Sequence, residues 1–222
     1  MAVMYDKSRL AGSILLLSFT IVFLSCGESA NNPDTGEKET PLILADTSFR
    51  NGDIIFQESE SGQSKAIKLA THSQYTHCGI LVQLAGEWKV LEAVQPVCVT
   101  SFESWIERGI NSHYVVKRHK ELDSLPSAPL LKMAEDYIGK DYDLVFAFSD
   151  AQMYCSELVW KIYSRFDKEI CPTRKLKEFD LDHPEVKRIM KKRYGTKIPY
   201  EESVISPADL FDSKNLIEIK RK

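Results

Sequence analysis

The order of apolar and polar positions divides the chain into three parts. An almost unbroken apolar run fills residues 11–24, and a polar stretch rich in turn-forming residues continues to about residue 45. From there to the C-terminus, short alternating runs and runs with the spacing of an amphipathic helix follow one another. We therefore expect one folded domain over residues 46–222, which is long enough to bury a core of ordinary size.

Alternating and β-branched runs predict strands in the middle of this domain. The turn formers Gly86–Glu87 separate the second strand from the third, so these two should form a β-hairpin. Gly79, inside the second strand, would let another backbone approach closely. The predicted strands cover residues 51–56, 77–84, 88–99 and 113–119, and two more flank a short helix that begins near Pro207.

Runs with helical spacing and terminal capping residues flank these strands. Strands that cluster together between helices are typical of an α+β fold with a central antiparallel sheet, and this is the fold class that we expect. The predicted helices lie within residues 61–73, 101–109, 127–139, 155–166 and 183–195.

The N-terminal apolar run has the features of an export signal. Lys7 and Arg9 precede it, small residues close it around Cys26, and it is shorter than the roughly 20 apolar residues of a membrane span. The stretch resembles a bacterial lipoprotein signal, which implies a signal peptide over residues 1–25, a lipid on Cys26 and a flexible tether over residues 26–45. The protein would then be exported and lipid-anchored to a membrane of the bacterial cell envelope. An uncleaved anchor helix is the alternative.

Composition and charge argue against several classes of function. The formal net charge of -3 offers no basic surface for nucleic acid, so we expect no nucleic-acid partner. Apart from Cys26, the cysteines are scattered and form no C-x-x-C pair, which gives no support to a disulfide framework or a zinc site. One disulfide among Cys78, Cys98 and Cys171 stays open.

Cys155 is the candidate nucleophile because of its place in a predicted helix. It shares the inward-facing stripe of that helix and lies near its start, where free backbone N–H groups and the helix dipole stabilise a thiolate. Residues 149–152 resemble a capping box, and a helix beginning there would move Cys155 into its second turn. A plain core cysteine is the alternative reading. The stripe comprises Leu158, Val159, Ile162, Tyr163 and Phe166.

A cysteine nucleophile needs a base and a group that orients the base. His77 opens a predicted strand, and Glu92 lies in the next strand, within reach across the hairpin. Direct pairing of the two would centre the hairpin near residues 84–85, ahead of the turn formers, so a bulge or an asymmetric loop is expected. Cys78 alternates with His77 and should point to the opposite face of the strand, with no base beside it.

Three motifs resemble the strand series of the NlpC-type cell-wall cysteine peptidases: GDIIF at residues 52–56, HCGILV at 77–82 and VLEA at 90–93. The nucleophile helix of that family is similar to CSELV at residues 155–159, but in that family it precedes the strands. Here it follows them, an order that resembles the circularly permuted papain-like amidases of the YiiX/YaeF type. The likeness extends over residues 50–219 and includes the motifs YIGKDYD and SPADLFDS.

The resemblance implies a circularly permuted papain-like fold and a cysteine-dependent hydrolase. On the matching positions, Cys155 is the nucleophile, His77 is the general base and Glu92 is the group that orients His77. Glu92 would hold one ring nitrogen of the imidazole while the other faces the sulfur, as such a triad requires.

Such a site would cleave an amide bond through a thioester on Cys155, without a cofactor or a metal. The backbone N–H groups of Cys155 and Ser156 are candidates to bind the oxyanion, and Tyr154 and Tyr75 are candidates to line the substrate pocket. The substrate would be a peptidoglycan-type peptide or an N-acyl amino acid. Two alternatives remain: a lipid acyltransferase or thioesterase that uses the same residues, and a catalytically inactive binding module of the envelope.

Overall fold

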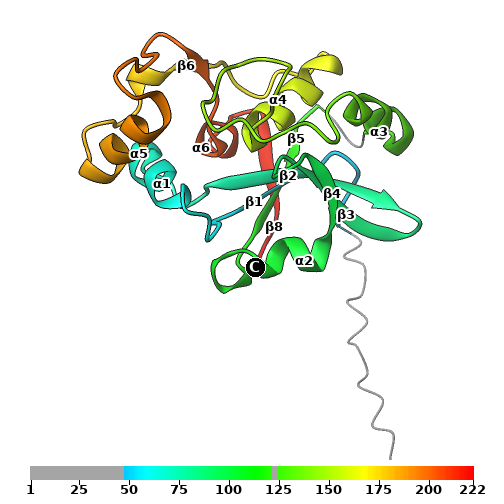
Figure 1. Cartoon of the computed structure of the whole chain (residues 1–222). Coiled ribbons are helices and arrows are strands. Elements are labelled where there is room, and N and C mark those ends of the chain that lie inside the picture. The colour runs from blue at the N-terminus through cyan, green and yellow to red at the C-terminus, as the bar shows by residue number, and fades with distance from the viewer. Residues whose placement is uncertain (1–47, 122–124) are drawn as a thin grey trace, which may run out of the picture. The chain divides into compact units, whose positions relative to one another are not determined.

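The structure, a computed structural model, describes residues 48–121 and 125–222 (Figure 1). The predicted signal peptide, the lipidation site Cys26 and the tether lie outside these residues. Within the described ranges, no helix is both long and apolar enough to cross a membrane.

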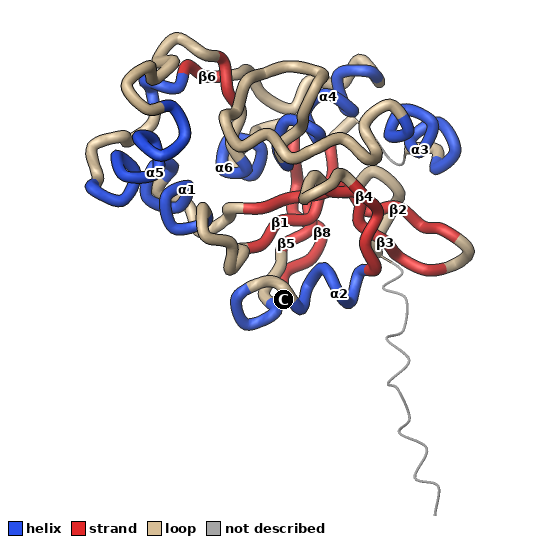
Figure 2. Tube along the Cα trace, in the orientation of Figure 1, coloured by secondary structure: helices blue, strands red, loops and turns tan. Residues whose placement is uncertain are grey.

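Six strands form one antiparallel sheet through the middle of the fold (Figure 2), which confirms the predicted α+β class. Along the sheet the order is β4-β3-β2-β1-β5-β8, so the β2–β3 hairpin lies between β1 and β4. The strands are β1 (Ile54–Gln57), β2 (His77–Leu84), β3 (Glu87–Glu92), β4 (Cys98–Ser101), β5 (Val115–His119) and β8 (Leu216–Arg221).

The β2–β3 hairpin closes through a two-residue turn of Ala85 and Gly86. Leu84 pairs with Glu87, and the two turn residues have φ angles of 50° and 83°. Positive φ at both central positions is the geometry of a type I′ turn, whose twist matches that of the two strands it joins. From Ile80 to Leu84 the register is regular, so the predicted bulge or asymmetric loop is wrong.

The predicted strand over residues 88–99 is two strands, β3 and β4, which pair with each other. The chain leaves the sheet after Glu92 and returns to it at Cys98. Pro96 lies in the connection, where its missing N–H removes no ladder hydrogen bond. The many apolar residues of this stretch predicted a single strand, although Pro96 is a residue that interrupts strands.

Helices cover both faces of the sheet, as alternation of the strand residues requires (Figure 1). On one face, α4 (Cys155–Arg165) packs against β2 and β3, and α3 (Ser127–Glu135) and α6 (Pro207–Phe211) pack against α4. On the other face, α2 (Phe102–Glu107) packs against β3 and β4. The first core includes Phe56, Cys78, Ile80, Cys155 and Leu158, and the second includes Ile55, Leu81, Val90 and Trp105.

A smaller cluster of elements stands beside α4. Helix α1 (Ser64–Thr71) packs against α5 (Pro184–Tyr194), and β6 (Arg174–Lys175) pairs with β7 (Ser203–Val204). Short 3-10 turns complete the elements at Ile110–Ser112 and Leu176–Glu178. The apolar side chains that join the cluster are Ala66, Leu176, Val186, Met190 and Val204.

Candidate active site

Cys155 is the first residue of α4, and Tyr154 is its N-cap. The alternative start of the helix at residues 149–152 is therefore wrong. The Tyr154 N–H donates to the Glu157 carboxylate at 3.4 Å, which ties the first turn together. A helix leaves the first backbone N–H groups without partners inside the helix, so those of Cys155 and Ser156 remain available beside the buried Cys155 thiol.

His77 and Glu92 form a buried pair, with 2.6 Å between His77 Nε2 and Glu92 Oε2. They are diagonal neighbours on one face of the hairpin, because the register of β2 and β3 sets Gly79 opposite Glu92. A Cβ atom on Gly79 would lie 2.4 Å from Val90 Cγ1 and 2.8 Å from the Leu91 carbonyl oxygen. The close approach predicted for Gly79 is confirmed.

The second oxygen of Glu92 is held by two residues that were not predicted from the sequence. Thr100 Oγ1 donates to Glu92 Oε1 at 2.5 Å, and Arg108 Nη2 donates to the same oxygen. Arg108 caps the C-terminus of α2, where cations are common in any helix, so nothing marked it in the sequence. On the same face, the Trp105 ring stacks on His77 with 5.8 Å between centroids.

The hydrogen bond to Glu92 occupies Nε2 of His77, so Nδ1 is the ring nitrogen left for Cys155. Burial opposes a charge on His77, but hydrogen bonds to Cys155 and Glu92 outweigh it and raise the pKa of His77 to about 9. The pKa of Cys155 moves in the opposite direction, well below its usual value. Together the two shifts favour a thiolate beside an imidazolium.

Cys78 also contacts the Cys155 thiol, which was not expected. A hydrogen bond from Cys78 is the largest cause of the lowered pKa of Cys155, ahead of the opposing effect of burial and the hydrogen bond with His77. Burial first, and Cys155 second, raise the pKa of Cys78 well above normal, so it stays a neutral donor. As predicted, the Cys78 side chain lies on the sheet face opposite to that of His77. Helix α4, which begins with Cys155, packs on this same face, so Cys78 and Cys155 belong to one core.

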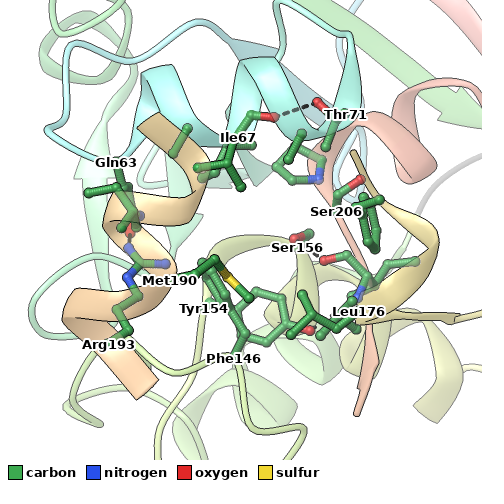
Figure 3. Close-up of a pocket in the computed structure, with 18 of the residues that line it drawn as sticks. Gln63, Ile67, Thr71, Phe146, Tyr154, Ser156, Leu176, Met190, Arg193 and Ser206 are labelled. Atoms are coloured by element: carbon green, nitrogen blue, oxygen red, sulfur yellow. Dashed lines mark hydrogen bonds between the residues drawn. The ribbon is translucent and has the colours of Figure 1, made fainter. Parts of the chain in front are cut away.

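Cys155 is one of the residues that line a mainly apolar pocket between α4 and the α1–α5 cluster. Figure 3 shows this pocket. Tyr154 and Ser156 line the pocket, as proposed for Tyr154 from the sequence. Tyr75 does not: its ring stacks on Phe211 at 3.9 Å and its hydroxyl accepts a hydrogen bond from Arg221, so its assignment to the pocket is wrong. Apolar lining residues are Ala66, Ile67, Ala70, Phe146, Leu176, Phe179, Leu181, Val186, Ile189 and Met190.

Three polar side chains that the sequence did not single out form one wall of this pocket. Gln63 Nε2 donates to the Tyr142 hydroxyl at 2.7 Å, and Arg193 Nη2 donates to the Gln63 side-chain oxygen. Tyr142 lies within the motif YIGKDYD and Arg193 within the basic run of the predicted helix over residues 183–195, but neither motif assigned them to this pocket.

Within the described residues, Cys78, Cys98, Cys155 and Cys171 carry free thiols, so the disulfide left open by the sequence is not formed. Across the same ranges, no three His, Cys, Asp or Glu side chains are placed to hold a metal ion together.

A cysteine at the start of a helix, with its histidine on an antiparallel sheet that comes earlier in the chain, defines a circularly permuted papain-like protein. Residues 48–220 match the family described as permuted papain-like amidase enzymes of the YaeF/YiiX type, the C92 family. The chain belongs to this family. At the family level, this membership supports a cysteine-type amidase.

Two relatives agree with this assignment. The uncharacterized protein YiiX of Escherichia coli strain K12 is 45% identical over 175 residues, which cover 78% of this chain and 87% of the relative. A crystal structure titled metalloprotein yiiX, from Escherichia coli O157:H7, matches with a TM-score of 0.74 and 45% identity, over 78% of this chain and 97% of that one.

Proposed function

We propose that the chain is a cysteine amidase in which Cys155 is the nucleophile, His77 the general base and Glu92 the residue that orients His77. The observation that carries the proposal is the buried 2.6 Å contact between His77 Nε2 and Glu92, which leaves Nδ1 for a cysteine at a helix start. Membership of an amidase family supports the same reaction.

In the acylation step, the Cys155 thiolate attacks the carbonyl carbon of the amide. The oxyanion accepts hydrogen bonds from the backbone N–H groups of Cys155 and Ser156. The His77 imidazolium then donates its proton to the departing amine, the C–N bond breaks, and a thioester on Cys155 remains.

In the deacylation step, neutral His77 takes a proton from water while the oxygen attacks the thioester carbon. The C–S bond breaks, the acid leaves, and the Cys155 thiolate and the His77 imidazolium are restored. A relative with a solved structure is titled a metalloprotein. The proposed steps use protein groups and water.

The apolar pocket supports a substrate with an apolar acyl group, such as an N-acyl amino acid or a peptide with an apolar side chain at the scissile bond. The same pocket favours one second candidate. If an alcohol or amine attacked the acyl-enzyme in place of water, the chain would be an acyltransferase. If the acyl-enzyme formed from a thioester substrate and water released the acid, the chain would be a thioesterase.

We also propose that the chain acts in the bacterial envelope, attached through a lipid on Cys26. The supporting observation is the order of basic residues, short apolar run and cysteine at the N-terminus.

The reaction is tested by trapping the intermediate. The protein is mixed with N-acyl amino acids and with peptidoglycan peptides, quenched in acid and weighed by mass spectrometry, with Cys155→Ala as the control. A fatty-acyl adduct on Cys155 supports the amidase on acyl substrates, and a peptidyl adduct supports the peptidase. An adduct discharged only by an added alcohol or amine identifies the acyltransferase. Failure of every substrate to turn over or acylate Cys155 would favour the inactive binding module.

A further inference from the structure

Arg193 is a cation in the wall of a pocket that is otherwise mainly apolar. It belongs to α5, its guanidinium lies 4.7 Å from the centroid of the Phe146 ring, and it donates a hydrogen bond to Gln63. Figure 3 shows Arg193 and Gln63 together on one side of the pocket. The neighbouring basic residues of the same helix, Lys191 and Lys192, are exposed to solvent.

Among the residues that the structure describes, no carboxylate forms an ion pair with Arg193. Asp143 acts on it through space, but one Asp143 oxygen accepts the Val145 N–H at 2.7 Å and burial raises the pKa of its carboxyl group. Burial is the largest effect on Arg193 and lowers its pKa, because apolar neighbours disfavour the charge. A half-buried cation without an ion-pair partner is most readily balanced by an anion that enters the pocket.

The guanidinium has donors to spare for such an anion. Arginine carries five N–H donors in a planar fork, and the hydrogen bond to Gln63 uses one of them. The Gln63 amide is fixed in turn by the Tyr142 hydroxyl, so both the position and the plane of the fork are held. A carboxylate is the anion that such a fork binds best through two parallel hydrogen bonds.

Cys155 lines the same pocket as Arg193 and the apolar side chains. Figure 3 shows Ser156, the residue after Cys155, in the same pocket as Arg193 and Gln63. A substrate bound in this pocket would therefore meet a cation, the nucleophile and apolar side chains.

We propose that Arg193, held by Gln63, binds a carboxylate of the substrate, and that the substrate class is the N-acyl amino acid. The acyl chain occupies the apolar part of the pocket, and the carboxylate of the departing amino acid lies on Arg193. The orientation of the substrate in this assignment rests on the proposed amide cleavage. Binding of a carboxylate by Arg193 does not require cleavage, so it is tested by measuring binding.

The test measures binding in the Cys155→Ala variant, where no turnover occurs, by calorimetry at neutral pH. The probes are N-octanoylglycine and its neutral amide, which have the same size and acyl chain. N-octanoylglycine should bind about 10-fold more tightly or better, as expected for hydrogen bonds to a charged group. Arg193→Gln should abolish this preference, and Arg193→Lys should keep part of it, because lysine retains the charge but not the fork.

Lys192→Gln is the matched control, since it removes the same charge from an exposed position on the same helix and should leave the preference unchanged. Circular dichroism and the melting temperature establish that each variant is folded. Equal binding of acid and amide, no binding of either, or a preference that survives in Arg193→Gln would overturn the carboxylate site. Release of octanoate by the wild-type protein is measured separately: a retained preference without release would count against amide cleavage while the carboxylate site stands.

Discussion

The opposite pKa shifts of His77 and Cys155 define the pH range in which both residues are charged. The imidazolium persists to about pH 9, and the thiolate forms below the usual pKa of a thiol. If this ion pair is the active form, kcat/KM rises with pH as Cys155 ionises. It falls again as His77 loses its proton near pH 9.

The substitution Glu92→Gln tests the orienting role. It keeps the size of the side chain but removes a charge that raises the pKa of His77, so the alkaline limb of the kcat/KM profile should move to lower pH. At neutral pH we expect kcat/KM to fall by about 10²-fold, the lower range for a misplaced general base. Glu87→Gln, at an exposed position of the same strand, is the control. An unchanged alkaline limb would assign Glu92 to packing.

Substitution of Cys78 offers a second test at the scale of single residues, because Cys78 affects the pKa of the Cys155 thiol. In the wild-type protein, iodoacetamide at mildly acidic pH should alkylate Cys155 before Cys78, Cys98 or Cys171. Cys78→Ala removes the hydrogen bond that lowers the pKa of Cys155 most, so the alkylation of Cys155 should require a higher pH. Cys78→Ser keeps a donor and should shift the profile less. Mass spectrometry of the alkylated peptides over pH measures both effects. Identical profiles for Cys78→Ala and the wild type would contradict this role.

At the scale of elements, the β2–β3 hairpin depends on the missing side chain of Gly79. Gly79→Ala would force its Cβ against Val90 and the backbone oxygen of Leu91, and such overpacking lowers the free energy of unfolding by about 1–3 kcal/mol. Urea denaturation measures the loss. In the control Gly62→Ala, the new methyl group meets open space, and a change within about 0.5 kcal/mol is expected. Equal stability of the two variants would show that the hairpin can relax around the methyl group.

The elements with clear periodicity and caps were predictable from the sequence. Helix α2 begins after its capping residue Ser101, and the C-terminal series of strand, helix and strand is observed as expected. The break between β3 and β4 was missed, although Pro96 inside the predicted strand is a signal for such a break. The hairpin register was missed because Ala85, an ordinary residue, adopts a positive φ that its identity does not announce.

The candidate site was predictable only where each residue carries its own signal. His77, Glu92 and Cys155 were candidates because a polar residue at a strand start, a carboxylate in an apolar strand and a cysteine near a helix start stand out, and the family resemblance then implied their roles. Thr100 and Arg108 carry no such signal, since their contact with Glu92 depends on how β4 and α2 pack. A contact that forms only when distant elements pack together has no signature in the local sequence around either residue.

At the scale of the whole molecule, the sequence makes one prediction that concerns residues outside the described ranges. If Cys26 carries a lipid, Cys26→Ser should release the protein from the membrane fraction or block its processing. Fractionation and the intact mass of the protein measure both. Continued membrane association with an unmodified mass would favour an uncleaved anchor helix, and Cys155→Ala alone would show whether attachment is independent of activity.

The clamp on Glu92 has a consequence for how substrates approach. Arg108, Glu92, His77 and Cys155 form a row of alternating sign that sums to zero when the thiolate–imidazolium pair is present. A row without net charge has only a dipole field, which falls off faster with distance than the field of a net charge, so it attracts or repels a distant charge weakly. Ionic strength should then leave kcat/KM for an uncharged amide nearly unchanged, and any salt dependence seen with anionic substrates must arise from cations elsewhere on the pocket wall.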